Sequence, residues 1–174
     1  MNRRSMKALA TVAGAFALLG VAAAPASAGA SPPLDAGCAG TIQVTAADQS
    51  GNPTAAAYGG GCKGSLGVNG MQGAIAVTGL AATSVCGNAG GFGAEHSDIL
   101  TAADGAQLVL RVVENACGEG PGAYHCIGTY TITGGTGRFV GATGTGTFDG
   151  HVNFNPNGSG TFRASYVGQT VWAR

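Results

Sequence analysis

The chain has 174 residues, of which 9% are charged, 45% are hydrophobic and 33 are glycine. Three of its eight basic residues lie within the first seven positions, so the rest of the chain carries five basic and eight acidic side chains and a formal charge of −3. A chain this poor in Lys and Arg lacks the basic surface that nucleic acid or an anionic lipid surface requires, which excludes both as expected partners.

Residues 1–28 have the pattern of a secretory signal peptide. A positive start is followed by apolar or small residues over 8–24, and Ala26-Ser27-Ala28 supplies small residues at the two positions that a signal peptidase reads. The apolar run is shorter than the roughly 20 residues of a membrane span, and no later stretch is long and apolar enough to be one. We therefore expect a secreted protein with no membrane span in the mature chain.

The mature part is expected to form one domain. Residues 29–37 contain Pro32-Pro33 and are expected to be a flexible lead-in, and residues 38–174 are expected to form the single domain. Helical spacing of apolar residues does not appear after the signal peptide. Scattered glycine also opposes helix, because a glycine in a helix interior costs about 1 kcal/mol relative to alanine.

The first half of the domain shows weak strand signals, in which Ala and Gly replace the usual β-branched residues. The candidate strands are residues 41–47, 55–60, 71–78 and 82–86.

The second half alternates apolar and polar residues clearly. The candidate strands are residues 107–114, 125–133, 142–154 and 161–172. Asp104-Gly105 and Asn157-Gly158 mark turns. Short strands with frequent turns predict an all-β antiparallel domain, either a β-barrel or, as the alternative, a β-sandwich.

Five cysteines lie in the mature part, and exported cysteines tend to pair. Cys117 and Cys126 bracket the tip of a predicted hairpin, where antiparallel partners can meet disulfide geometry. The second expected bridge joins Cys62 to Cys86, which leaves Cys38 as the odd thiol. The chain contains no Cys-x-x-Cys and no Cys/His spacing of a zinc site, so neither a metal nor another cofactor is predicted.

Residues 129–150 carry a family resemblance. Their core, Ile-Thr-Gly-Gly-Thr-Gly-Arg-Phe-Val-Gly-Ala-Thr-Gly, resembles small secreted bacterial proteins of uncharacterised function. More distantly, it is similar to the barrel superfamily of allene oxide cyclase and the plant dirigent proteins, which share a Gly-Gly-Thr-Gly turn between strands. The resemblance covers residues 107–172 and implies an eight-stranded antiparallel barrel with a small lumen. It brings no catalytic residue, because neither the cyclase carboxylate with its polar partners nor the paired lumen acids of dirigent proteins find a matching context here.

The glycine-rich segment Gly134-Gly-Thr-Gly137 is read as a structural turn. A phosphate-binding loop would need a following helix and a Lys, whereas Arg138-Phe139 leads into more strand-like sequence. Glycine supplies the positive φ that such a turn requires. Phe139 is then expected to close one end of the core.

Glu95-His96-Ser97-Asp98 is the densest polar cluster in the chain. On a strand, His96 and Asp98 would share a face, and His96 would then be a base oriented by Asp98. No serine has the context of a nucleophile, however. The preceding glycines favour the alternative of a solvated loop.

The sequence suggests one possible ligand site. It consists of polar residues on the strand faces that do not carry the large apolar residues. If these faced a polar lumen, Arg111, Asp149 and Arg163 would line it. If the core is apolar, which is the commoner arrangement, these three residues lie on the solvent-exposed outer surface.

These observations favour a non-catalytic extracellular protein that binds a small hydrophobic molecule or a cell-surface partner. The alternative is an isomerase or cyclase that uses the barrel lumen, as the resemblance implies. A purely structural protein with a filled core is the third possibility.

Overall fold

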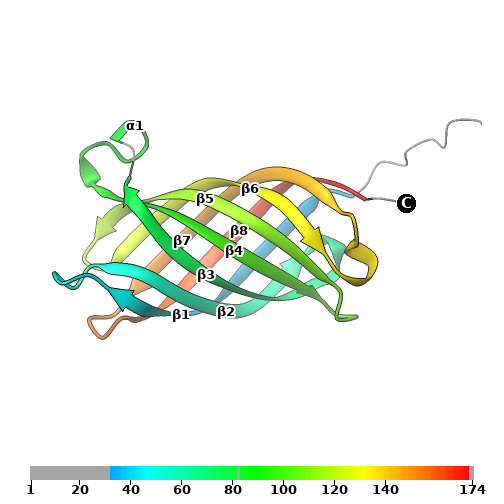
Figure 1. Cartoon of the computed structure of the whole chain (residues 1–174), viewed down its shortest axis with the longest axis horizontal. Coiled ribbons are helices and arrows are strands. Elements are labelled where there is room, and N and C mark those ends of the chain that lie inside the picture. Colours follow the sequence, from blue (N-terminus) through cyan, green and yellow to red (C-terminus); the bar gives the residue numbers. More distant parts are fainter. Residues whose placement is uncertain (1–31, 82, 173–174) are drawn as a thin grey trace, which may run out of the picture.

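The computed structural model describes residues 32–81 and 83–172, so the expected signal peptide lies outside the described residues. Figure 1 shows long tilted strands wound into one closed barrel. The strands are β1 (Leu34–Ala47), β2 (Pro53–Gly64), β3 (Val68–Leu80), β4 (Gly91–Ala102), β5 (Gln107–Gly120), β6 (Ala123–Gly135), β7 (Thr143–Phe154) and β8 (Ser159–Val171). Each strand pairs antiparallel with the next, and β8 pairs with β1 to close the barrel. The predicted eight-stranded antiparallel barrel is confirmed, and the described residues do not form a sandwich.

Two expectations about the first half of the chain are wrong. Residues 82–86 were expected to be a strand, but Thr83–Cys86 forms the short helix α1, and the fourth strand is β4 instead. β1 begins at Leu34, so the last four residues of the expected lead-in pair with β8 in the barrel wall. Small residues gave the starts of β1 and β4 the composition of a loop, and pairing with neighbouring strands overrides that composition.

The two ends of the barrel are built differently (Figure 1). The loops 48–52, 83–90, 121–122 and 155–158 lie at one end, which we call the α1 end. The loops 65–67, 103–106 and 136–142 lie at the other, the η3 end, which is named after the 3₁₀ turn η3 (Gly137–Phe139).

The Gly-Gly-Thr-Gly-Arg-Phe segment closes the η3 end. Gly137 has φ 57°, and a Cβ there would lie 2.9 Å from the Cβ of Ala106, so the turn requires glycine at this position. Phe139 is fully buried and its ring lies 5.7 Å from that of Trp172, which confirms the expected plug. Arg138 donates to Asp104 Oδ2 at 2.9 Å and to the carbonyl of Leu66, and thereby ties three loops together.

The cysteine pairing differs from the expected one. The disulfides join Cys38 to Cys62 and Cys86 to Cys117, and Cys126 is a buried free thiol. Cys38 and Cys62 are direct cross-strand partners in β1 and β2. Neither expected bridge forms.

The expected Cys117–Cys126 bridge does not form, because the two cysteines are not opposite each other in the β5–β6 pairing. Ala116 is opposite Cys126, and Cys117 is opposite His125. A shift of one residue along a strand moves a side chain to the other face of the sheet. Cys126 therefore points into the barrel, while Cys117 points outward toward α1, where it bonds to Cys86.

Candidate functional site

The three residues expected to line a polar lumen lie on the outer surface. Arg111, Asp149 and Arg163 are all exposed. Arg111 donates to both carboxylate oxygens of Glu95, at 2.6 and 2.7 Å, on the outside of the wall. The lumen assignment is therefore wrong for all three, because their strands turn the large apolar residues inward.

The interior is filled mainly by aromatic and aliphatic side chains. Phe148, Phe162 and Tyr166 are buried, and the ring of Phe148 lies 5.3 Å from that of Tyr166. The cavity between these side chains measures about 20 Å³, which is room for about one water molecule. Typical ligand cavities measure about 300–1,000 Å³, so the lumen has no space for an organic ligand in this conformation.

A polar cluster lies inside this apolar shell. β4 places His96 and Asp98 on its inner face, with relative exposures of 4% and 0%. His96 Nδ1 lies 2.8 Å from Asp98 Oδ1. The hydroxyl groups of Tyr58 and Tyr166 donate to the two oxygens of Asp98. The shared face of His96 and Asp98 matches the sequence interpretation as a strand, and the alternative of a solvated loop is wrong.

Glycine makes room for this cluster. Gly73 is opposite both Tyr58 and Asp98 in the neighbouring strands. A Cβ on Gly73 would lie 2.4 Å from the Tyr58 hydroxyl and 2.6 Å from Asp98 Oδ1. The high glycine content is therefore partly a requirement of packing large polar side chains into a narrow barrel.

A second carboxylate reaches His96 from β5. Glu114 is 4% exposed, and its Oε2 lies 3.5 Å from His96 Nε2. Burial lowers the pKa of His96, but the contacts with Asp98 and Glu114 outweigh it and raise the pKa to about 9. His96 is therefore protonated at neutral pH, as an imidazolium between two carboxyl groups.

The interior hydroxyl groups of Tyr58 and Tyr166 and the free thiol of Cys126 remain protonated at neutral pH. Burial and the nearby Asp98 raise the pKa of Tyr58 and of Tyr166 well above the ordinary value. Burial and Glu114 raise the pKa of the Cys126 thiol. The interior thus offers hydroxyl and thiol donors around one buried cation, a set of groups that often marks functional sites.

The α1 end carries a pocket of ligand size. It measures about 600 Å³ and lies where β1, β3 and β5 end and β2, β4 and β6 begin. Phe92 and Tyr124 line it, and their half-buried rings meet edge to face at 5.1 Å. Phe154 packs against Tyr124 at 6.3 Å. All three aromatic side chains are partly buried and pack against the hydrophobic core.

Two sets of bonds hold the walls of this pocket. The Cys86–Cys117 disulfide ties α1 to β5, and Gly118 N donates to Gly90 O at 3.1 Å. On the opposite wall, Asp48 Oδ1 accepts from the backbone N–H of Ser50 and Asn52 at 2.8 and 2.9 Å. Because the walls are already ordered, binding a ligand there loses little loop entropy.

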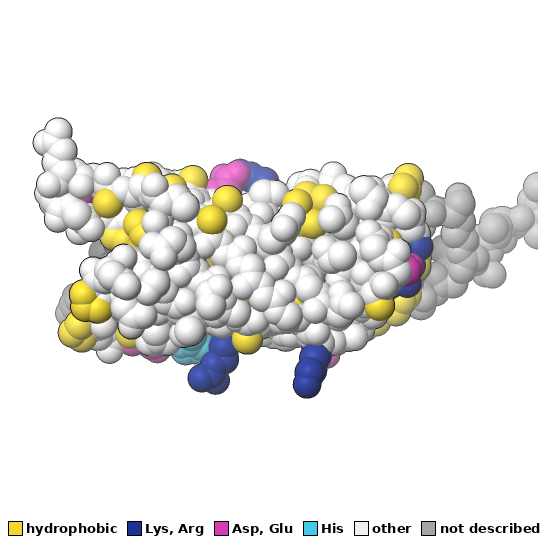
Figure 2. All heavy atoms as spheres, turned by 90° about the horizontal axis from the view of Figure 1, so that it is seen from below, with side chains coloured by type: hydrophobic (Ala, Val, Ile, Leu, Met, Phe, Trp, Pro, Cys, Tyr) yellow, Lys and Arg dark blue, Asp and Glu magenta, His cyan; other side chains and the backbone are white. Residues whose placement is uncertain are grey.

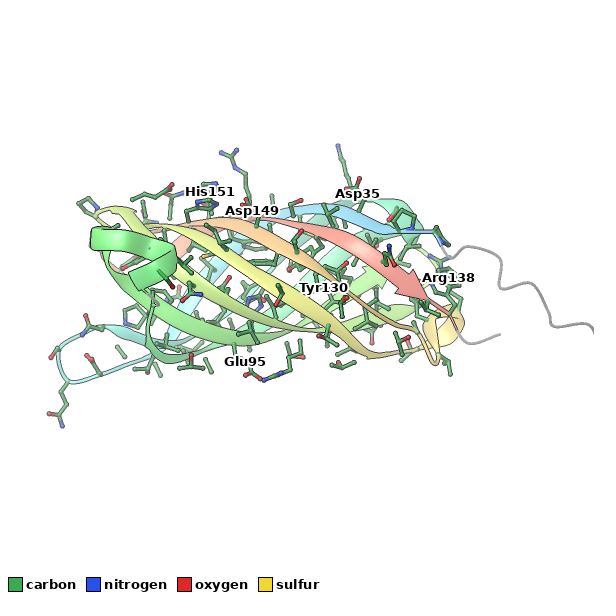
Figure 3. All side chains as sticks on the ribbon, turned by 90° about the horizontal axis from the view of Figure 1, so that it is seen from above. Asp35, Glu95, Tyr130, Arg138, Asp149 and His151 are labelled. Atoms are coloured by element: carbon green, nitrogen blue, oxygen red, sulfur yellow. A yellow bond between two sulfur atoms is a disulfide. The ribbon has the colours of Figure 1, made fainter. Side chains whose placement is uncertain are left out.

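A third group of polar side chains lies on the outer face near the α1 end. His125 and His151 are cross-strand partners in β6 and β7, and Asp149 lies two residues before His151 on the same face. Figure 3 shows Asp149 and His151 next to each other on the outside of the barrel, with Tyr130 within it and Arg138 at the η3 end.

Several members of these sites carry no recognisable sequence signal. Glu114 ends the predicted strand 107–114, and its inward direction follows only from the alternation with Leu110 and Val112, whose side chains are fully buried. Tyr58 and Tyr166 lie on the same strand faces as nearby apolar residues. The sequence alone therefore predicts ordinary core residues at both positions. Only the closed barrel brings them to Asp98.

No known family model, curated protein or solved structure matches the chain. Within residues 32–81 and 83–172, no helix has the length and apolar character that crossing a membrane requires.

Proposed function

We propose that this protein is an exported binding protein that takes a small aromatic or otherwise apolar molecule at the α1 end of the barrel. The observation that carries the proposal is the pocket of about 600 Å³ over Phe92 and Tyr124. Its size matches that of small-molecule sites, and its apolar floor has polar groups at the rim, including Asp48, Asn52 and Thr54. The two disulfides are compatible with an oxidising, extracellular environment.

The filled interior favours this end of the barrel over the lumen as the site. A ligand in the lumen would have to displace Phe148 or Phe162, which are 6% exposed and packed against the core. The pocket at the α1 end needs no such rearrangement. The same reasoning favours a compact ligand that rests on the aromatic floor.

A binding titration tests the proposal. We expect saturable, one-site binding of N-phenyl-1-naphthylamine, a neutral aromatic fluorophore, and about tenfold weaker binding by the Phe92→Ala and Tyr124→Ala variants. Val140→Ser is the matched control, because Val140 is a 65% exposed apolar residue at the opposite end. Binding that is unsaturable, or equally weakened by Val140→Ser, would contradict the proposal. Native mass spectrometry of protein purified from culture medium would add the identity of any retained molecule.

A second candidate function is an isomerase or cyclase reaction in the lumen, in line with the family resemblance. The observation that favours it is the buried His96 between Asp98 and Glu114, beside Tyr58 and a thiol. Such a cluster supplies proton donors and acceptors within one apolar enclosure. Turnover of an allene oxide generated in situ, abolished by Glu114→Gln in a folded variant, would support it. Absence of turnover above the buffer rate would eliminate it.

A further inference from the structure

The outer face of the barrel brings together two histidines and two carboxylates that the proposed ligand site does not use. They are His125, Asp149, His151 and Glu119, which we call the outer cluster. Their side chains are between 30% and 59% exposed, so an ion in solution can reach them. Figure 2 shows histidine side chains gathered beside a basic side chain at one edge of the barrel surface.

The spacing of three of these side chains suits a metal ion. One ligand atom each from His125, Asp149 and His151 lies within 4.8 Å of the other two. His125 Nε2 and Asp149 Oδ2 are 2.9 Å apart. In a tetrahedral site with bonds of about 2.0–2.1 Å, ligand atoms lie about 3.3 Å apart. Exposed side chains reach that spacing by small rotations.

The strands hold this arrangement in place. The rings of His125 and His151 stack at 4.5 Å with planes 1° apart, because the two residues are directly opposite each other in β6 and β7. The backbone ladder therefore fixes the Cα positions of both histidines and keeps their rings side by side before an ion binds. A preformed pair of ligands on rigid strands reduces the ordering cost of binding.

We propose that the outer cluster binds one divalent transition metal ion of the zinc type, through His125, Asp149 and His151. Two imidazoles and one carboxylate form a donor set that suits Zn²⁺ and its first-row neighbours, whereas Ca²⁺ and Mg²⁺ prefer oxygen ligands. Three protein ligands leave a fourth position open. That position faces solvent and takes water or a small anion.

Glu119 and Arg163 extend the site. Glu119 Oε2 lies 3.3 Å from His151 Nδ1, so this carboxylate orients the ring while Nε2 binds the ion. Arg163 is the cross-strand partner of His151 in β8. It borders a groove of about 540 Å³ that also touches Asp149 and His151 and leaves room for an anion at the open position.

A calorimetric titration with Zn²⁺ tests this assignment on full-length mature protein purified without a polyhistidine tag and stripped with a chelator. We expect one Zn²⁺ per chain. Loss of an outer partner of a metal ligand typically weakens binding about 10- to 100-fold, which we expect for Glu119→Gln. His125→Ala and His151→Ala should each weaken binding by at least about 100-fold. Glu95→Gln is the matched control, because Glu95 is an exposed carboxylate that pairs with Arg111 elsewhere on the wall, and it should bind Zn²⁺ unchanged.

A second measurement needs no variant. Diethyl pyrocarbonate modifies exposed histidines, and mass spectrometry locates the modified residues. We expect Zn²⁺ to protect His125 and His151 in the folded protein, while the buried His96 stays unmodified with or without Zn²⁺. Equal modification of His125 and His151 in the presence and absence of saturating Zn²⁺, or full Zn²⁺ binding by the His125→Ala/His151→Ala double variant, would overturn the proposal.

Discussion

The barrel wall separates two clusters that are made of the same chemical groups. Inside, His96 lies between Asp98 and Glu114, and all three are at most 4% exposed. Outside, His125 and His151 lie beside Asp149 and Glu119, all at least 30% exposed. The inner cluster is enclosed by tyrosine hydroxyl groups and aromatic rings, and the outer one faces solvent.

Residue type alone therefore does not decide the role of a histidine–carboxylate cluster. Burial makes each inner charge depend on its partner, because an unpaired charge in the interior is strongly unfavourable. Exposure lets each outer charge be solvated on its own, so the pairing contributes little to stability. The inner cluster is therefore coupled to folding, and the outer one is available for binding.

The largest expected effect comes from removing the inner cation. The His96→Ala variant leaves two carboxyl groups buried without their partner and should lose about 3–5 kcal/mol of unfolding free energy. His151→Ala is the surface counterpart and should change that free energy by about 1 kcal/mol or less. Urea unfolding of both variants measures the difference. Equal losses would show that the two clusters are not energetically distinct.

The pH dependence of stability gives the next largest effect. The pKa of His96 is raised from 6.5 to about 9 in the folded protein. Its stabilising contribution is therefore complete below pH 6.5 and is lost as the pH rises to about 9. A shift of this size corresponds to about 3 kcal/mol. Denaturant unfolding at pH 6, 7.5 and 9.5 should show the loss in the wild type and not in the His96→Ala variant.

The tyrosines around Asp98 should show an intermediate effect. Tyr166→Phe removes a hydrogen bond to a buried carboxylate, which should cost about 1.5–3 kcal/mol. Tyr130 provides the matched control, since its buried hydroxyl has no hydrogen-bond partner among the described residues. Tyr130→Phe should therefore leave stability unchanged or raise it slightly. A larger loss for Tyr130→Phe than for Tyr166→Phe would contradict the assigned network.

The smallest effect on stability is expected for the outer carboxylate. Asp149 contacts His125 at 2.9 Å but is 59% exposed. Asp149→Asn should change the unfolding free energy by less than about 1 kcal/mol, yet it should abolish the stabilisation of the folded protein by Zn²⁺. Thermal unfolding with and without Zn²⁺ measures both properties in one experiment. An Asp149→Asn variant that loses stability but is still stabilised by Zn²⁺ would contradict both expectations.

Much of the barrel could be predicted from the sequence because its second half alternates clearly. Tyr130 and Ile132 face inward and Ile127 faces outward, as the period of two requires. The glycine turn before Phe139 was also recognisable. β4 was missed because Gly91, Gly93 and Ala94 carry little strand signal, and α1 was mistaken for a strand because four residues show no helical period.

The site was less predictable for a geometric reason. Closing a barrel brings together residues that are distant in sequence, such as Tyr58, Asp98 and Tyr166, and no local pattern records this. His125 and His151 meet only because β6 and β7 pair in one register. The disulfide pairing depends on the same information, since a single residue decides whether a cysteine points inward or outward.

The buried free thiol of Cys126 can report opening of the barrel. Cys126 lies across the wall from the Cys86–Cys117 bridge, and thiol–disulfide exchange requires contact between a thiolate and a disulfide sulfur. The closed wall prevents contact, and the raised pKa suppresses the thiolate. Alkylation of Cys126 by iodoacetamide under native conditions, or its exchange with a disulfide, therefore requires the barrel to open around Cys126. The rate of that labelling reports how readily the folded barrel opens.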